Sequence, residues 1–243
     1  RGRHAVLERI AARGAAITLG ASPDLVGRAR RAGAVDARFL PVVAPPLPAA
    51  SRAPAEVRRE LGVGERPLVL VAARLAPQKR LDLLVDATAG WADEAGGPMV
   101  VVAGAGPLAD ALVRRAERAR SPVVLLGHRD DPADLLAAAD LTVLPSEWEA
   151  RPLVIQEALR AGVPVLATDV GGVRDLVGDA AVLVPAGDVA ALRQALRGLL
   201  DDPGHRAALG ARGQARSLTL PSVADMVDGL LTTYAEVPHR RPR

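Results

Sequence analysis

The sequence predicts an α/β fold with a doubly wound parallel sheet, and three observations support this. Apolar runs and helical patterns alternate along most of the 243 residues, as expected of strand–helix–strand units. The apolar runs are short and hydrophobic on both faces, as in residues 67–73, which is typical of strands buried in a parallel sheet. With 49% hydrophobic and 24% charged residues, the chain has the balance of a globular protein with a substantial core.

The predicted strands are rich in valine, leucine and alanine. We expect them at about 15–19, 38–43, 67–73, 98–103, 122–126, 141–144, 164–167 and 180–184. The stretches between them carry apolar residues at helical spacing, which indicates amphipathic helices. We expect these helices at about 23–32, 54–61, 80–91, 107–120, 132–139, 152–161 and 188–201, with closing helices at about 203–216 and 221–235.

A boundary is predicted near residues 41–54, which begin with a proline-dense, uncharged segment. Such a segment is extended and semi-rigid, which is typical of a linker. Too few strands precede it for an independent domain, and the first residue is Arg1 rather than Met. We therefore expect a domain remnant with its linker at 1–48, a main α/β domain at 49–216, and a final helix and tail at 217–243.

Composition excludes several classes of function. Without cysteine, the chain has no disulfide, thiolate metal site or cysteine nucleophile. The net charge is only +3 and the charges are mixed along the chain, so we expect no nucleic-acid partner despite the basic isoelectric point. The aromatic residues are too few to stack single-stranded bases. They are Phe39, Trp91, Trp148 and Tyr234.

Membrane and metal signatures are also missing from the sequence. The longest charge-free stretch, 95–109, is interrupted by glycine and proline and is shorter than the roughly 20 apolar residues that cross a bilayer. No signal peptide is visible, so we expect a cytoplasmic protein without a membrane span. Because Asp-x-Asp, His-Glu-x-x-His and Gly-x-Ser-x-Gly patterns are absent, we expect no metal and no cofactor.

Residues 102–109 match the G-x-G-x-x-A pattern of dinucleotide-binding turns through Gly104 and Gly106. A dinucleotide site also needs an acidic residue about 20 residues later, at the end of the next strand. That strand ends at 124–127 without a carboxylate. We therefore interpret the glycines as a structural turn, with Pro107 at the start of the following helix.

Arg74 and Lys79 are the first candidate site residues. They follow the predicted strand 67–73, at the carboxyl edge where open α/β sheets bind ligands. A planar guanidinium and a compact ammonium together suit a diphosphate. Lys79 is the single lysine among 31 basic residues, which favours a task that arginine cannot perform. A solvated basic loop, with a lysine kept by chance, is the competing interpretation.

The second candidate segment joins the end of a predicted strand to the start of the next helix. Pro152 fits the first helical position, so the first free backbone N–H groups belong to Leu153 and Val154, where the helix dipole favours an anion. Glu157, about one turn into the helix, suits the hydroxyls of a ribose. Glu149 faces the same edge and can accept hydrogen bonds from sugar hydroxyls. Interaction with the helix dipole is the alternative, and it explains Glu149 better than Glu157.

The third candidate segment, 161–172, is a strand followed by Gly171 and Gly172. Close approach of a ligand, or of a neighbouring loop, would explain the two glycines.

In order and spacing, these three segments resemble the nucleotide-sugar-binding half of retaining glycosyltransferases of family 4, which have the GT-B fold with Rossmann-like domains. The family pattern is a G-R-L-x-x-x-K-G loop, an E-x7-E segment and an A-x-G-x-P-V-x-x-x-x-x-G-G turn. The resemblance covers about residues 65–237. The matching residues are Arg74, Leu75, Lys79, Glu149, Glu157, Gly162, Pro164, Gly171 and Gly172.

The resemblance implies catalytic roles for three side chains. Arg74 and Lys79 would bind the donor diphosphate, and Glu149 would contact the transferred sugar. The sequence departs from the family at Arg80, where the family has glycine, and at Arg151, where it has phenylalanine. An arginine at 151 adds a cation beside the sugar, which bears on donor identity.

The resemblance also implies donor-binding roles outside this catalytic group. Glu157 would hold the ribose, and the backbone N–H groups of Leu153 and Val154 would bind phosphate. Arg129 and Asp131 fall where the family cradles the nucleobase, largely through backbone atoms.

The implied reaction is transfer of a hexose from a UDP- or GDP-sugar to an acceptor hydroxyl, with retained anomeric configuration and without a metal. Because residues 1–40 resemble only the end of the family's amino-terminal acceptor domain, we expect this chain to bind the donor but not to turn it over alone. Two alternatives stay open. In the first, the chain is a nucleotide-sugar-binding module without catalysis, or one that needs a partner chain to complete the cleft. In the second, it belongs to a GT-B nucleotide-sugar epimerase.

The closing helix at 221–235 carries an apolar stripe. Ordinary core packing is the interpretation that we favour. The alternatives are packing on residues 1–40, or an exposed face that promotes self-association. The stripe consists of Val223, Met226, Val227, Leu230 and Leu231.

Overall fold

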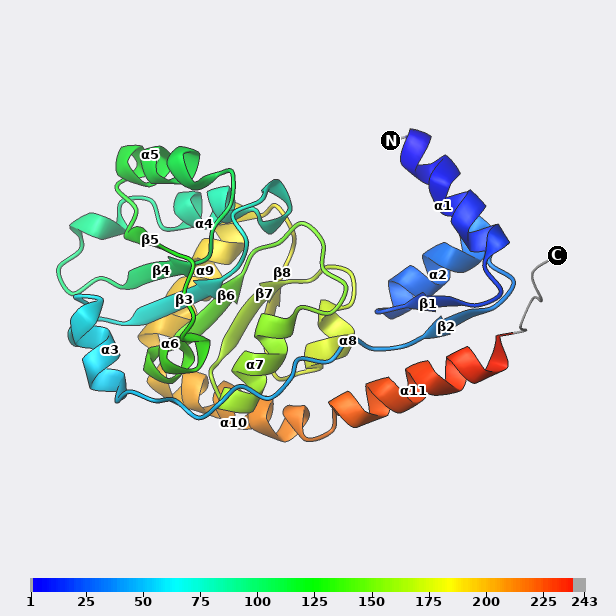
Figure 1. The fold of residues 1–243 in the computed structure, drawn as a ribbon. Helices are drawn as coiled ribbons and strands as arrows, with labels where there is room; N and C mark the ends of the chain where they lie inside the picture. Colours follow the sequence, from blue (N-terminus) through cyan, green and yellow to red (C-terminus); the bar gives the residue numbers. More distant parts are fainter. Residues whose placement is uncertain (1, 238–243) are drawn as a thin grey trace.

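The computed structural model describes residues 2–237, in which two parallel sheets are present (Figure 1). The larger sheet has six strands in the order β5-β4-β3-β6-β7-β8, and the smaller one pairs β1 with β2. The predicted doubly wound α/β fold is therefore confirmed. The strands are β1 (Thr18–Gly20), β2 (Ala37–Phe39), β3 (Leu68–Ala72), β4 (Met99–Ala103), β5 (Val123–Gly127), β6 (Leu141–Leu144), β7 (Val165–Thr168) and β8 (Val182–Val184).

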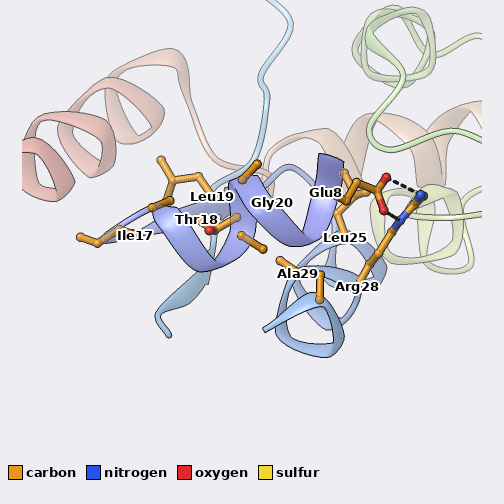
Figure 2. Close-up of a pocket in the computed structure, with 12 residues that line it drawn as sticks. Glu8, Ile17, Thr18, Leu19, Gly20, Leu25, Arg28 and Ala29 are labelled. Atoms are coloured by element: carbon orange, nitrogen blue, oxygen red, sulfur yellow. Dashed lines mark hydrogen bonds and ion pairs between the residues drawn. The ribbon is translucent and has the colours of Figure 1, made fainter. Parts of the chain in front are cut away.

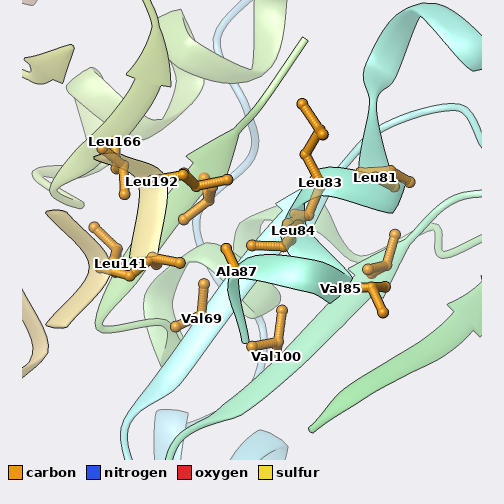
Figure 3. Close-up of a cluster of buried hydrophobic side chains, with 14 of the residues drawn as sticks. Val69, Leu81, Leu83, Leu84, Val85, Ala87, Val100, Leu141, Leu166 and Leu192 are labelled. Atoms are coloured by element: carbon orange, nitrogen blue, oxygen red, sulfur yellow. The ribbon is translucent and has the colours of Figure 1, made fainter. Parts of the chain in front are cut away.

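Helices cover both faces of the larger sheet, because alternate strand residues point to opposite sides. The surrounding helices are α3 (Pro54–Glu60), α4 (Leu81–Ala87), α5 (Ala109–Ala119), α6 (Pro132–Ala138), α7 (Leu153–Ala161), α8 (Val173–Val177), α9 (Val189–Asp201) and α10 (Pro203–Ser217). Leu68 and Leu70 of β3 belong to one apolar cluster, together with residues of α3, α6, α7 and α8. Val69 and Val71 belong to the other, which includes α4, α5 and α9 (Figure 3).

Several element ends differ from the predicted ones for local reasons. β2 stops at Phe39 rather than at 43, because the prolines that begin at Pro41 cannot donate to a strand ladder. The helix predicted at 80–91 ends at Ala87. There the Thr88 hydroxyl donates back to the Leu84 carbonyl at 2.8 Å, and Gly90 then takes a φ of 81°. The structure also contains α8 and α1 (Gly2–Gly14), which the sequence pattern does not predict.

The proline-dense linker lies against α7 instead of crossing solvent freely. It has no regular structure over residues 40–53. The Gln156 side chain accepts a hydrogen bond from Ala44 N at 3.0 Å and donates one to the Val42 carbonyl at 3.1 Å. Arg160 Nη1 donates to the Ala44 carbonyl at 2.7 Å. These bonds attach the linker to the same helix that carries Glu157.

The smaller sheet packs with α1 and α2 (Pro23–Ala32) beside the larger one (Figure 1). A cavity of about 440 Å³ opens between α1, β1 and α2, and small apolar side chains form most of its wall. Glu8 and Arg28 face each other there, with Arg28 Nε 3.0 Å from Glu8 Oε2 (Figure 2). None of the predicted site residues lines this cavity.

The closing helix, α11 (Val223–Glu236), contains no buried residue, so the favoured interpretation of core packing is wrong. It continues from the end of α10 and runs along β2, beyond the larger sheet (Figure 1). Only one side of the helix therefore meets the rest of the chain. Val223, Val227 and Leu231 on its other side are 36%, 42% and 60% exposed.

The inner side of α11 packs on residues 1–40, the first of the two alternatives. A Cβ added to Gly229 would lie 2.8 Å from Leu40 Cδ1, so helix and linker approach closely there. Arg38 of β2 forms an ion pair with Glu236 at 2.5 Å. Self-association through the outer side stays a prediction.

An ion-pair network joins the end of the linker to the first turn of α6. Asp134 is buried, and it accepts hydrogen bonds from Ser51 N at 2.6 Å and Arg52 Nε at 2.9 Å. The Arg52 guanidinium and the bonds from Ser51 lower the pKa of Asp134 to about 2. The charged carboxylate is thus part of what holds α6 and the linker together.

We expect Asp134→Asn to lower the thermal midpoint at pH 7 and to have progressively less effect as the pH falls toward about 2. A carboxyl whose pKa is lower in the folded state contributes stability above its ordinary pKa, and this stability is lost as pH falls through the folded value. Melting curves of both proteins across this range measure the difference. Asp130→Asn is the matched control, because the Asp130 side chain is 94% exposed. A gap between Asp134→Asn and the unmodified chain that is constant with pH would contradict the argument.

Candidate active site

Three loops meet at the carboxyl edge of the larger sheet because the strands that precede them are neighbours. β3, β6 and β7 lie side by side and are parallel, so the loops that follow them leave the same edge. These loops are 73–79, 145–152 and 169–172, which are the three segments singled out in the sequence.

The loop after β3 is joined to the loop after β6 through Gln78. Glu147 N donates to the Gln78 carbonyl at 2.8 Å, and Gln78 Nε2 donates to the Trp148 carbonyl at 2.5 Å. Gln78 lies in a short 3-10 turn (Pro77–Lys79) that sets the position of the next residue, Lys79.

Lys79 and Glu149 are in direct contact, although the sequence pattern treats them as separate candidates. Lys79 Nζ donates to Glu149 Oε1 at 2.5 Å, and the Ser146 hydroxyl donates to the same oxygen at 2.6 Å. The Glu149 side chain is only 8% exposed and the Lys79 side chain 18%. The carboxylate thus lies beside the ammonium at the edge of the sheet.

The two glycines after β7 are explained by a neighbouring loop. A Cβ on Gly171 would lie 2.0 Å from the Glu149 carbonyl oxygen, and one on Gly172 would lie 2.1 Å from that of Ala150. Gly172 N also donates to the Glu149 carbonyl at 2.9 Å. The loop that carries Glu149 is therefore held from both sides, by 77–79 and by 171–172.

The start of α7 differs slightly from the prediction. Pro152 has a ψ of 126° and precedes the helix, so it is not the first helical residue. As the N-cap it lies outside the helix and has extended backbone, while its carbonyl can accept the first intrahelical bond. As at every helix start, the N–H groups of Leu153 and Val154 have no intrahelical partner. No side chain caps this start in their place. This is the arrangement that binds anions at helix starts.

Glu157 and Val154 of α7 line a small cavity of about 80 Å³ at the same edge. Its other walls come from the ends of β3 and β4, from α6 and from the loop after β5, where His128 and Arg129 lie. Arg74, Lys79 and Glu149 do not line this cavity. No hydrogen bond or ion pair joins the Glu157 carboxylate to the described side chains, 5–237. Burial raises the pKa of Glu157, and the nearby charge of Arg160 only partly opposes this.

We expect Glu157→Gln to raise the thermal midpoint of the free protein by about 2 °C at neutral pH. A carboxyl whose pKa is raised on folding favours the folded state below its ordinary pKa, and this contribution is lost as pH rises through the folded value. Glutamine carries no charge, so the gain should appear at pH 7 and vanish near about pH 4. Melting curves at the two values measure it, and an equal shift at both would contradict a charge effect.

Arg74 follows β3 on a loop that the G-x-G-x-x-A turn supports. Leu75 N donates to the Ala105 carbonyl at 3.0 Å. A Cβ on Gly104 or Gly106 would lie 2.0 Å from the Ala73 oxygen or 2.4 Å from the Leu75 oxygen. The glycines are thus a structural turn, as predicted, although α5 begins at Ala109 rather than Pro107. The Arg74 guanidinium forms no hydrogen bond or ion pair with the described side chains.

Arg129 and Asp131 differ in their relation to the cavity. Arg129 lines it, and its guanidinium also pairs with Asp131 at 2.6 Å and with Glu60 at 2.8 Å. Asp131 additionally pairs with Arg52. The Arg129 guanidinium, more than any other group, holds the pKa of Asp131 below its usual range. The side chain of Asp131 therefore belongs to the network that fastens α3 to α6.

Sequence reasoning did not single out Ser146 or Gln78. Ser146 is completely buried and stands three residues before Glu149. The S-x-x-E spacing is the available signal, but it is also the pattern of a helix capping box. Here no helix starts at Ser146, and the hydroxyl meets the carboxylate instead of a backbone N–H.

Among the described residues, no group of three or more histidine, aspartate or glutamate side chains is arranged to hold a metal ion. Across residues 2–237, every helix is too short or too polar to cross a bilayer.

A profile of the family described as "Glycosyl transferases group 1" matches residues 55–216, which contain all the candidate site residues. The chain belongs to this family. Its match includes the loops after β3, β6 and β7, so the segments that meet at the sheet edge are part of the shared glycosyltransferase group 1 sequence.

Relatives in the glycosyltransferase group 1 family include two bacterial enzymes. A D-inositol 3-phosphate glycosyltransferase of Xylanimonas cellulosilytica is 36% identical over 216 residues, covering 84% of this chain and 50% of that protein. A GDP-mannose-dependent monoacylated alpha-(1-6)-phosphatidylinositol monomannoside mannosyltransferase of Corynebacterium glutamicum is 34% identical over 179 residues, covering 69% of this chain and 47% of that protein. The chain thus spans about half the length of these relatives.

Solved structures show the same fold. The Anabaena protein HepE in complex with UDP-glucose superposes with a TM-score of 0.85 at 23% sequence identity, covering 98% of this chain and 70% of that one. This likeness confirms the α/β, GT-B-type architecture of the described residues.

Proposed function

We propose that this chain is the donor-binding part of a retaining glycosyltransferase, which transfers a hexose from a nucleoside diphosphate sugar to an acceptor hydroxyl. The proposal rests chiefly on the shared edge of the sheet: Lys79 follows β3, the uncapped start of α7 and Glu157 follow β6, and these two strands are neighbours. A cation and free N–H groups suit a pyrophosphate, and a carboxylate beside them suits the hydroxyls of a ribose.

In this proposal, the protein lowers the barrier by stabilising the departing diphosphate. Negative charge grows on the leaving group while the sugar becomes positively charged, so donors held in place beforehand are most effective. Lys79, Arg74 and the N–H groups of Leu153 and Val154 are these donors. Each charge-assisted hydrogen bond contributes about 1.5–3 kcal/mol. With these groups in place, we propose a reaction without a metal.

Glu149 is assigned to the transferred sugar and Glu157 to the ribose. Both carboxylates accept hydrogen bonds and neither can donate when ionised, which suits the hydroxyls of the donor. Arg129, on the cavity wall, is assigned to the nucleobase end. Asp131 acts beside it by holding the Arg129 guanidinium.

A thermal-shift panel tests the donor assignment. One relative is named for GDP-mannose and one structural neighbour holds UDP-glucose, so the panel contains UDP, GDP, ADP and dTDP with their hexose derivatives. We expect at least one diphosphate to raise the thermal midpoint more than its nucleoside does. If no nucleotide stabilises the chain at millimolar concentration, the proposal is wrong.

Transfer of a labelled hexose by the purified chain tests catalysis. We expect donor binding without turnover, because the catalytic cleft of the proposed enzyme needs an acceptor-binding side. Measured transfer would show that the 243 residues suffice. Conversion of the donor into its epimer would instead identify a nucleotide-sugar epimerase.

A further inference from the structure

The Lys79 ammonium, which the proposed function assigns to the diphosphate, already forms an ion pair within the protein. Glu149 Oε1 accepts hydrogen bonds from Lys79 Nζ at 2.5 Å and from the Ser146 hydroxyl at 2.6 Å. Both charged side chains are largely buried. The positive charge of Lys79 is therefore neutralised by an internal carboxylate when no ligand is present.

Two requirements follow for any anion that binds here. It must draw the ammonium away from a carboxylate with which it already makes a short, charge-assisted bond. It must also leave that carboxylate satisfied, because a buried charge without a donor is costly. Ser146 supplies a donor suited to the second requirement, since its hydroxyl also donates to Glu149 Oε1.

Ser146 is held in place independently of Lys79. The Thr168 hydroxyl, at the end of β7, donates to the Ser146 carbonyl at 2.6 Å, and both residues are buried. On the other side of the loop, Gly172 N donates to the Glu149 carbonyl. The hydroxyl and the carboxylate are thus fixed to the sheet edge, whereas the lysine reaches them by a flexible side chain.

We propose that Glu149 is an internal competitor of pyrophosphate for Lys79, and that Ser146 is a positioning residue which keeps Glu149 hydrogen-bonded when the lysine turns to the ligand. The inference rests on the proposed function, because it presumes that a diphosphate binds at Lys79. It adds a means of specificity. Every diphosphate must break the pair between Lys79 and Glu149, but only a diphosphate that carries a sugar can offer Glu149 a hydroxyl in return.

Calorimetric titration of the full chain with inorganic pyrophosphate tests both parts. Glu149→Gln removes the competing charge and should tighten pyrophosphate binding about fivefold. Ser146→Ala leaves the displaced carboxylate without a donor and should weaken binding about tenfold. In the double variant the serine should matter little, because a neutral amide needs no such compensation.

Thr142→Val is the matched control for loss of a buried hydroxyl, on the strand β6 that leads into the loop of Ser146. Thr142 is completely buried, and its Oγ1 has no hydrogen-bond partner among the described residues. This variant should leave pyrophosphate affinity unchanged. Melting curves of the unmodified chain and of the four variants establish that each is folded.

The outcomes separate this inference from the proposed function. If nucleotides bind but Glu149→Gln leaves pyrophosphate affinity equal or lower, the competition is refuted and the donor site survives. If Ser146→Ala has the same effect in the Glu149→Gln background as in the unmodified chain, the positioning role is refuted. If neither pyrophosphate nor any nucleotide binds, both proposals fall together.

Discussion

Replacing Lys79 with alanine is expected to weaken binding of a nucleoside diphosphate about a hundredfold, and binding of the bare nucleoside by less than about threefold. The variant removes the ammonium that faces the proposed pyrophosphate position. It also removes the only positive charge that pairs with the buried Glu149 in the described residues, so that the negative charge of this carboxylate repels the ligand. Both effects act on phosphate and neither acts on the nucleobase.

Calorimetric titration with the diphosphate and the nucleoside measures this difference. Arg115→Ala is the control, because it removes one cation from a half-exposed ion pair with Asp86 that joins α5 to α4. It should leave both affinities unchanged. Equal losses for the two ligands in Lys79→Ala would refute the phosphate role.

The second large effect is expected from Gly171→Ala. The new Cβ would lie 2.0 Å from the Glu149 carbonyl oxygen, and Gly171 has a φ of 52°. Backbone must therefore move on a loop that is also joined to residues 77–79. We expect a loss of about 2–4 kcal/mol in the free energy of unfolding, together with weaker diphosphate binding because Glu149 and Lys79 are displaced.

Urea unfolding measures this loss, and Gly198→Ala on α9 is its matched control. A Cβ on Gly198 meets nothing within 4 Å, so alanine should stabilise the helix by about 0.5–1 kcal/mol. A stability of Gly171→Ala within about 0.5 kcal/mol of the unmodified chain would show that the loop absorbs the side chain.

The carboxyl-edge position of the candidate residues could be predicted from the sequence. Apolar runs such as 67–73 identify buried parallel strands, and a residue that follows such a strand must lie at one known edge. This predicts that Arg74, Lys79 and Glu149 lie at the same edge of the sheet. Their actual contacts need the strand order, in which β3 lies beside β6.

The expectation that the closing helix packs in the core failed, because the elements around a side chain, and not its periodic spacing, decide how exposed it is. The stripe on α11 has helical spacing, yet Leu231 is 60% exposed because the helix extends beyond the larger sheet. Asp131 follows a predicted strand and suits a ligand site. Its side chain pairs with Arg129 and Arg52, a contact that the sequence does not predict because Arg52 lies far away along the chain, and its part in a donor site stays a prediction.

The amino-acid sequence by itself determined all eight strands and most of the helices, which faces are apolar, and that the single lysine follows a buried strand. Only the tertiary structure decided that this lysine meets Glu149, 70 residues away, with Ser146 on the same oxygen. It also decided that a loop fills the space beside Gly171 and Gly172. The physical reason is that periodicity encodes local geometry, whereas contacts between distant residues depend on the order in which strands pair.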